Sequence, residues 1–210
     1  MMRNIAIGGV LLALFAMVGT GLVSATYLLT KDQIAENEKQ RLLGSINALL
    51  PASAYDNAIE QDLIFIRDPI ISGKEEIPVY RARNGEEDVA AIIGAIAPDG
   101  YAGPIKLLIG IRVSGEITGV RVISHHETPG LGDAIEIDRS DWLLSFIGKS
   151  LSSLTEAEWA VKKDGGVFDQ FTGATITPRI VVKSVHNTLL YFQKNRKRLF
   201  ESPAYQGEAT

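Results

Sequence analysis

The sequence predicts an α+β protein with a single N-terminal transmembrane helix, and three observations support this fold class. Residues 5–29 contain no charged side chain and are bracketed by Arg3 and Lys31. Short β-prone runs follow from residue 63 onward, two of them in a hairpin pattern. A long amphipathic helix pattern then extends from residue 178 to about residue 200. We therefore expect one anchored domain in which helices pack on an antiparallel sheet.

The uncharged segment is long enough to cross a bilayer, because about 20 apolar residues suffice. The alternative is a cleaved signal peptide with residues 23–25 as its cleavage site, but a signal core usually has about 7 to 15 apolar residues. A retained anchor is therefore favoured. Lys and Arg residues near the span do not favour an N-terminus on the cytoplasmic side, so charge alone leaves the orientation open.

The remaining elements follow in order along the chain. Residues 30–50 read as a helical stalk that ends at Pro51. Strands are expected at residues 63–66, 77–82, 89–96, 105–113 and 117–123. Residues 131–154 mix helix with loop. The expected organisation is a tail (1–4), a transmembrane helix (5–29), a stalk (30–60), a domain (61–200) and a flexible C-terminal tail (201–210).

Composition excludes several classes of function. The net charge of −4 gives no reason to expect nucleic-acid binding. The chain has no cysteine, so disulfides, iron–sulfur ligation and thiol catalysis are excluded. The three histidines, His125, His126 and His186, lack the spacing of a metal site, and no metal is expected.

The most informative motif is the segment Asp169-Gln170-Phe171-Thr172-Gly173-Ala174-Thr175. Pro178 suits the first position of the helix that follows, and Thr177 suits its cap. A helix start that is rich in hydroxyl groups can hold a phosphate, because free N–H groups and the helix dipole favour negative charge there. The alternative is an ordinary turn and helix cap.

Two upstream loops are also rich in turn residues. One is His125-His126-Glu127-Thr128-Pro129-Gly130-Leu131-Gly132, between the predicted hairpin and the following helix, and the other is Asp99-Gly100-Tyr101-Ala102-Gly103-Pro104. Such loops bring backbone N–H groups close to a flat or anionic ligand. A purely structural turn explains each loop at least as well as a ligand-binding loop does.

Taken together, the three segments resemble a known family. The motif at 169–175 is similar to the acceptor signature of covalently flavinylated proteins, in which a flavin transferase joins the FMN phosphate to the last Thr or Ser. With the two loops in this order, residues 80–200 and the anchor resemble the FMN-binding G subunit of the Rnf electron-transport complex. The C subunit of the sodium-translocating NADH:quinone oxidoreductase is related but usually longer, so the short stalk favours the Rnf protein.

This resemblance implies a covalent FMN on Thr175 and an electron-carrier subunit that has no catalytic residues of its own. It implies further cofactor-binding residues at Thr172, Gly173, Ala174, Thr177, Thr128, Gly130, Leu131, Gly132, Tyr101 and Gly103. Asp169 matches the leading acid of the motif. The implied partners are the other membrane and soluble subunits and the flavin transferase. The implied location is the bacterial inner membrane, with the domain on the periplasmic side.

The resemblance also implies that the complex couples ferredoxin and NAD redox chemistry to ion pumping. This chain has no glycine fingerprint for NAD, so NAD chemistry is expected in a partner. The alternatives are the related protein of the quinone reductase, a flavin-binding sensory or assembly module without turnover, and an anchored structural protein.

Overall fold

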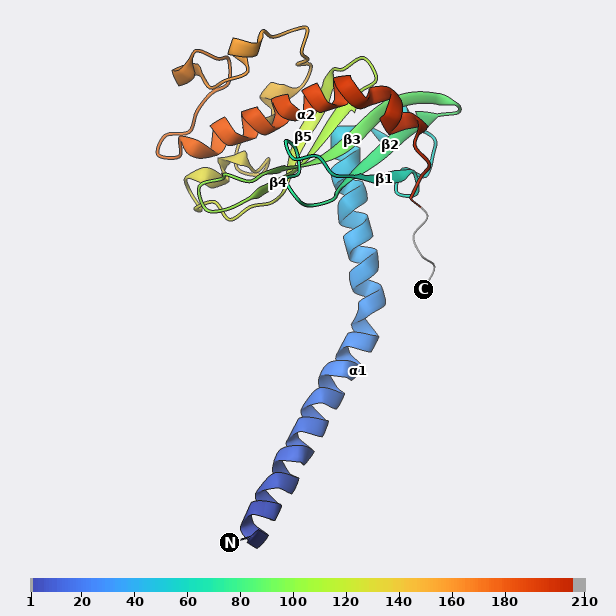
Figure 1. The fold of residues 1–210 in the computed structure, drawn as a ribbon, viewed down its shortest axis with the longest axis vertical. Coiled ribbons are helices and arrows are strands. Elements are labelled where there is room, and N and C mark those ends of the chain that lie inside the picture. The colour runs from blue at the N-terminus through green and yellow to red at the C-terminus, as the bar shows by residue number, and fades with distance from the viewer. Residues whose placement is uncertain (1, 206–210) are drawn as a thin grey trace. The chain divides into compact units, whose positions relative to one another are not determined.

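The computed structural model describes residues 2–205 and confirms the α+β architecture (Figure 1). The chain divides into two units, one ending at Gly44 and the other beginning at Ser45. The first unit is the larger part of helix α1 (Met2–Leu49), and the second contains the sheet and helix α2 (Ile176–Glu201). The boundary between the units falls inside the predicted stalk, so residues 45–60 belong to the domain.

Helix α1 joins the predicted membrane span and the predicted stalk in one uninterrupted helix. Ile7–Leu49 is long and apolar enough to cross a membrane, by length and composition. Large apolar side chains such as Leu12, Phe15 and Leu29 are exposed along it, as expected of a helix surrounded by lipid. The helix ends just before Pro51, which cannot donate a helical hydrogen bond.

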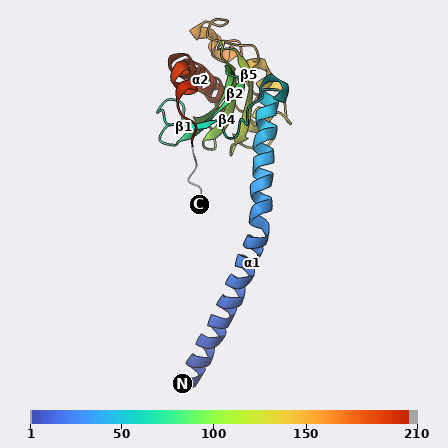
Figure 2. The same ribbon diagram turned by 90° about the vertical axis from the view of Figure 1, so that its right-hand side faces the viewer.

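The sheet is an antiparallel meander of five strands in the order β1-β2-β3-β4-β5. Its strands match the predicted runs closely: β1 (Leu63–Ile66), β2 (Ile77–Asn84), β3 (Glu87–Ala97), β4 (Ile105–Arg112) and β5 (Ile117–Ser124). Helix α2 packs across β3 and β4, and Figure 2 shows it as a separate layer beside the sheet. The main core lies between these two layers and includes Ile93, Ile109, Val185 and Phe192.

The opposite face of the sheet is covered by the last turn of α1, through a notch made of two glycines. Gly110 and Gly119 are direct partners on β4 and β5. A Cβ atom at Gly119 would lie 3.0 Å from Leu49 Cδ2, and one at Gly110 would lie 3.3 Å from Leu49 Cβ. Leu49 is buried there, and Arg121 donates a hydrogen bond to the Ala48 carbonyl, at 3.4 Å. This turn is therefore part of the domain core.

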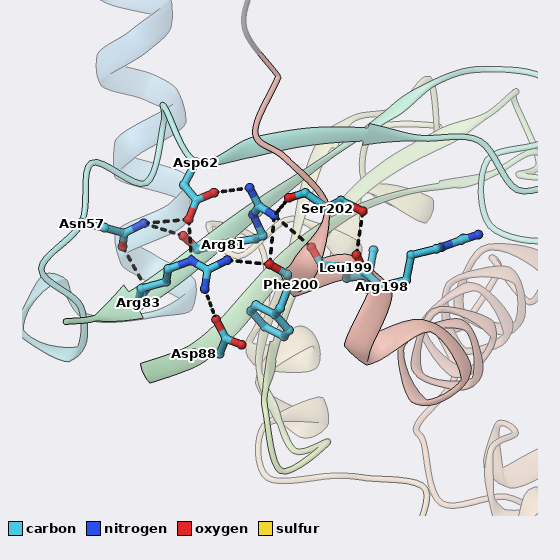
Figure 3. A network of polar contacts seen from close by, with 9 residues as sticks. All are labelled: Asn57, Asp62, Arg81, Arg83, Asp88, Arg198, Leu199, Phe200 and Ser202. Atoms are coloured by element: carbon cyan, nitrogen blue, oxygen red, sulfur yellow. Dashed lines mark hydrogen bonds and ion pairs between the residues drawn. The ribbon is translucent and has the colours of Figure 1, made fainter. Parts of the chain in front are cut away.

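Two arginines of β2 hold the C-terminal end of α2 (Figure 3). Arg81, which is 2% exposed, pairs with Asp62 and donates to backbone carbonyls of Leu199, Phe200 and Ser202. Arg83 donates to the Phe200 carbonyl at 2.8 Å and also bonds the carboxylates of Asp62 and Asp88. The last carbonyls of a helix have no intrahelical partner. The two guanidinium groups supply those partners.

The start of the C-terminal tail is held in place, contrary to the expectation of a flexible segment from residue 201. The Tyr205 N–H donates to the Leu63 carbonyl at 2.6 Å. The Tyr205 ring also meets the Phe65 ring edge-on, with centroids 5.1 Å apart. Residues 206–210 of the predicted tail lie outside the described residues.

Candidate functional site

The buried carboxylate of Glu127 connects the two upstream loops to the first turn of α2, the helix that follows the motif at 169–175. Glu127 is 5% exposed and follows strand β5. Its Oε1 accepts a hydrogen bond from the Ala102 N–H at 3.1 Å. Its Oε2 accepts a hydrogen bond from the Thr177 hydroxyl in the first turn of α2. One side chain thus joins the turn at 100–103, the loop at 127–132 and the start of α2.

The loop at 127–132 packs tightly against this junction. A Cβ atom at Gly132 would lie 2.7 Å from Glu127 Oε2 and 3.2 Å from Thr177 Oγ1, so only glycine fits. Gly130 has a φ of +79°, in the left-handed region that glycine adopts readily. The Leu131 and Gly132 N–H groups both donate to the Thr128 carbonyl at 3.1 Å. The loop is a compact turn, with Leu131 45% exposed at its tip.

The motif at 169–175 forms a tight turn between aromatic packing and the helix. The Ala174 N–H points to the Phe171 carbonyl at 3.4 Å, and Gly173 has a φ of +83°. A positive φ at the third position of a β-turn indicates a type II turn, which selects glycine. The Phe171 ring packs on Trp142, whose indole N–H donates to the Asp169 carbonyl at 2.8 Å. The turn is therefore fixed from its N-terminal side.

Helix α2 begins two residues earlier than predicted, at Ile176, with Thr175 at the N-cap position. Thr177 and Pro178 are the second and third helical residues. Pro178 still lies in the first turn, where its missing N–H costs nothing. Thr177 does not cap the helix, because its buried hydroxyl is donated to Glu127. The expectation that Thr177 caps the helix is therefore wrong, and its hydroxyl proton is not available to a phosphate.

Thr175 fits the role of an attachment point on three counts. Its side chain is exposed, and within residues 2–205 no side-chain hydrogen bond caps the helix start. The first turn of α2 also contains no Asp or Glu of its own. The acid that bonds this turn, Glu127, does so on the buried side through Thr177, so on the exposed side, at Thr175, the helix dipole can still attract an anion. Thr172 is exposed two residues before Ala174. This arrangement suits a phosphate ester on the Thr175 hydroxyl.

The segments that meet at the start of α2 carry both apolar and charged exposed side chains. Leu131 and Ile176 are exposed and apolar. Sites for flat ring systems are lined mainly by apolar side chains of this kind. Tyr101 is 74% exposed on the turn at 100–103, where the Gly103 N–H donates to the Gly100 carbonyl at 3.3 Å. Lys162 bonds the Asp169 carboxylate at 2.6 Å.

Arg179, one turn into α2, is held by a bidentate ion pair. Its Nε and Nη2 donate to the Asp164 carboxylate at 2.5 and 2.7 Å. The Arg179 guanidinium therefore keeps the pKa of Asp164 below its usual value. This cation is therefore already engaged by the Asp164 carboxylate.

His125 is bonded through both ring nitrogens. Its Nδ1 accepts from the Glu127 N–H at 3.1 Å, and its Nε2 lies 2.7 Å from Glu136 Oε1. This pairing requires the proton on Nε2 when the ring is neutral. His125 thus supports the loop at 127–132.

Sequence reasoning assigned Glu127 no role in the site. Its only signal in the sequence was an acid immediately before a loop of proline and glycine.

Comparisons with known proteins agree with both parts of the chain. The family model of the RnfG N-terminal region matches residues 1–49, and that of the FMN-binding domain matches residues 100–190. The G subunit of the ion-translocating oxidoreductase complex from Escherichia coli (strain K12) is 48% identical over 204 residues, which cover 97% of this chain and 98% of that protein. Its counterpart from Vibrio atlanticus (strain LGP32) is 45% identical over 203 residues, 97% of each chain.

One solved structure is also similar to part of this chain. It is the C subunit of the Na⁺-translocating NADH-quinone reductase from Parabacteroides distasonis. It is 26% identical, covers 61% of this chain and 64% of its own, and superposes with a TM-score of 0.45.

Proposed function

Because this chain belongs to the family of G subunits of ion-translocating oxidoreductase complexes, we propose that it is their membrane-anchored electron carrier. In this role it relays electrons on FMN between the other subunits of the complex. The complex would couple ferredoxin and NAD redox chemistry to ion pumping. FMN, when bound, accepts and releases the electrons, while the protein supplies position and electrostatics.

The observation that carries the proposal is the exposed Thr175 at the uncapped start of α2. We assign it a phosphoester bond between Thr175 Oγ1 and the FMN phosphorus. The Thr175 oxygen attacks the phosphorus of a flavin phosphate donor held by the transferase, the bond from that phosphorus to the donor's leaving group breaks, and the leaving group departs with the hydroxyl proton. The chain therefore gains FMN less one water. N–H groups of the first helical turn and the helix dipole then offset the phosphate charge.

The neighbouring residues shape the approach to that bond. The turn that directly precedes the attached phosphate consists of Thr172, Gly173 and Ala174. The flavin ring is contacted by the compact loop at 127–132, through Thr128, Gly130, Leu131 and Gly132. The turn at 100–103 borders the ring with Tyr101 and Gly103. Asp169 serves recognition by the flavin transferase. Its backbone carbonyl is held by Trp142, which fixes the start of the motif.

Helix α1 anchors the domain, which we place on the periplasmic side of the bacterial inner membrane. A covalent bond suits that location, because a non-covalent cofactor is lost by mass action wherever its free concentration is low. It also permits a shallow, exposed site from which a neighbouring protein of the complex can reach the ring.

The test uses the full chain expressed with and without a flavin transferase. After denaturation, ultraviolet fluorescence that stays with the protein band reports covalent flavin. Wild type with the transferase should fluoresce, and Thr175→Ala should not. Thr155→Ala changes an exposed threonine of another loop and is the matched control, which should keep the signal. Fluorescence that persists in Thr175→Ala would falsify the attachment site.

A further inference from the structure

We propose that Glu127 is the positioning residue that holds Thr175 in the conformation accepted for flavin attachment, an inference that rests on the proposed function. Glu127 is 5% exposed, and its two carboxylate oxygens bond two different segments. A carboxylate is costly to bury unless its oxygens accept hydrogen bonds. Here the two hydrogen bonds join the turn at 100–103 to the first turn of α2, with Glu127 itself at the start of the loop at 127–132.

The position of Glu127 at the start of α2 explains how a buried acid is accommodated. The first turn of α2 has no acid of its own, so the loop supplies one to the positive end of the helix dipole. The Thr177 hydroxyl adds a direct hydrogen bond. Glu127 thus binds the helix start from outside the helix and fixes the loop at 127–132 against it.

Thr175 depends on this contact because its own side chain is not held. It is the N-cap residue, two positions before Thr177, and within the described part of the chain its hydroxyl makes no cap hydrogen bond. Its direction is therefore set by the backbone of the first turn, and that turn is pinned at Thr177. An acceptor threonine that is already held in one conformation loses less conformational entropy when it binds the flavin transferase than a flexible one does.

The central experiment compares two substitutions of Thr177 in the full-length chain. Thr177→Val keeps the shape but removes the hydroxyl, whereas Thr177→Ser keeps the hydroxyl. With limiting flavin transferase, intact mass gives the fraction of chain that carries flavin. We expect the initial loading rate to fall on the order of fivefold in Thr177→Val and Glu127→Ala, the size of a contact of about 1 kcal/mol. Thr177→Ser should load like wild type.

Two controls separate positioning from general loss of stability. The double variant Glu127→Ala/Thr177→Val should load no more slowly than either single variant, because both remove one contact. Arg83→Ala breaks the polar network at the far end of α2 and should load normally even where its unfolding midpoint is lowered. Should Glu127→Ala not fold, the Thr177 pair decides alone.

The inference fails if Thr177→Val loads as fast as wild type, or if Arg83→Ala loads as slowly as Thr177→Val. Either result, with flavin still on Thr175 in wild type, leaves the proposed function standing. Wild type without covalent flavin, or Thr175→Ala with it, overturns the proposed function itself.

Discussion

The Leu131 side chain lies against Gly173, so that the loop after β5 touches the turn that precedes α2. A Cβ atom at Gly173 would be only 3.1 Å from Leu131 Cδ2. Gly173 also has a φ of +83°. Both the space and the backbone conformation at this position therefore select glycine.

Gly173→Ala should weaken both the turn and flavin attachment. A left-handed conformation costs a non-glycine residue about 1–2 kcal/mol, and here the neighbouring Leu131 must also shift. Chemical denaturation in detergent and intact mass measure the two effects. Gly85→Ala is the control, because Gly85 has a φ of +59° in open space between β2 and β3. Equal flavin loading in the two variants would contradict the role of this contact.

The glycine notch under Leu49 allows a prediction about how the last turn of α1, which belongs to the domain, stabilises the sheet. Gly119→Ala should lower the free energy of unfolding of the domain by about 1–3 kcal/mol, because the new methyl group meets Leu49 Cδ2. Leu49→Ala alone should cost about 2–5 kcal/mol through the cavity it leaves. In the double variant the cost of Gly119→Ala should largely disappear. Additive costs would show that the two residues do not share the notch.

Arg81 should be worth more to stability than Arg83, its partner in the network of Figure 3. Arg81→Met leaves the Leu199 and Ser202 carbonyls without this donor and should lower the free energy of unfolding by about 3 kcal/mol. Arg83 is 25% exposed, and Arg83→Met should cost less. Urea denaturation of both variants in detergent measures the difference. Equal losses of the free energy of unfolding would mean that burial does not determine how much these hydrogen bonds stabilise the domain.

The environment of His186 allows us to predict how the free energy of unfolding changes with pH. Burial lowers the pKa of His186 below its ordinary value of 6.5, where its ring stacks on Trp159 at 5.3 Å. Between the folded pKa and 6.5 the unfolded chain binds more protons, so stability should rise with pH through that window. His186→Phe keeps a stacking ring without a titratable group. The free energy of unfolding of wild type relative to this variant should therefore increase from about pH 5 to pH 7, and a flat or falling difference would contradict the assignment.

The strands could be predicted because each one is encoded locally, by β-prone runs bounded by turns such as Asn84-Gly85. The motif around Thr175 could be recognised in the sequence because its residues are contiguous, whereas its place at the N-cap of α2 was not predicted. The start of α2 was placed two residues late because cap rules consider only neighbouring residues, whereas Thr177 bonds Glu127 from another segment. The roles of Glu127 and Arg81 depend on partners brought together only by the folded chain, as when Arg81 reaches the carbonyls of α2.

The central claim is that Thr175 carries FMN, and the mass of the chain purified from its native membrane tests it most directly. The account predicts an added mass of one FMN less one water, found on the peptide that contains Thr175. It also predicts no added mass in Thr175→Ala expressed in the same cells. A wild-type chain at its unmodified mass, or flavin on a different residue, would contradict the account.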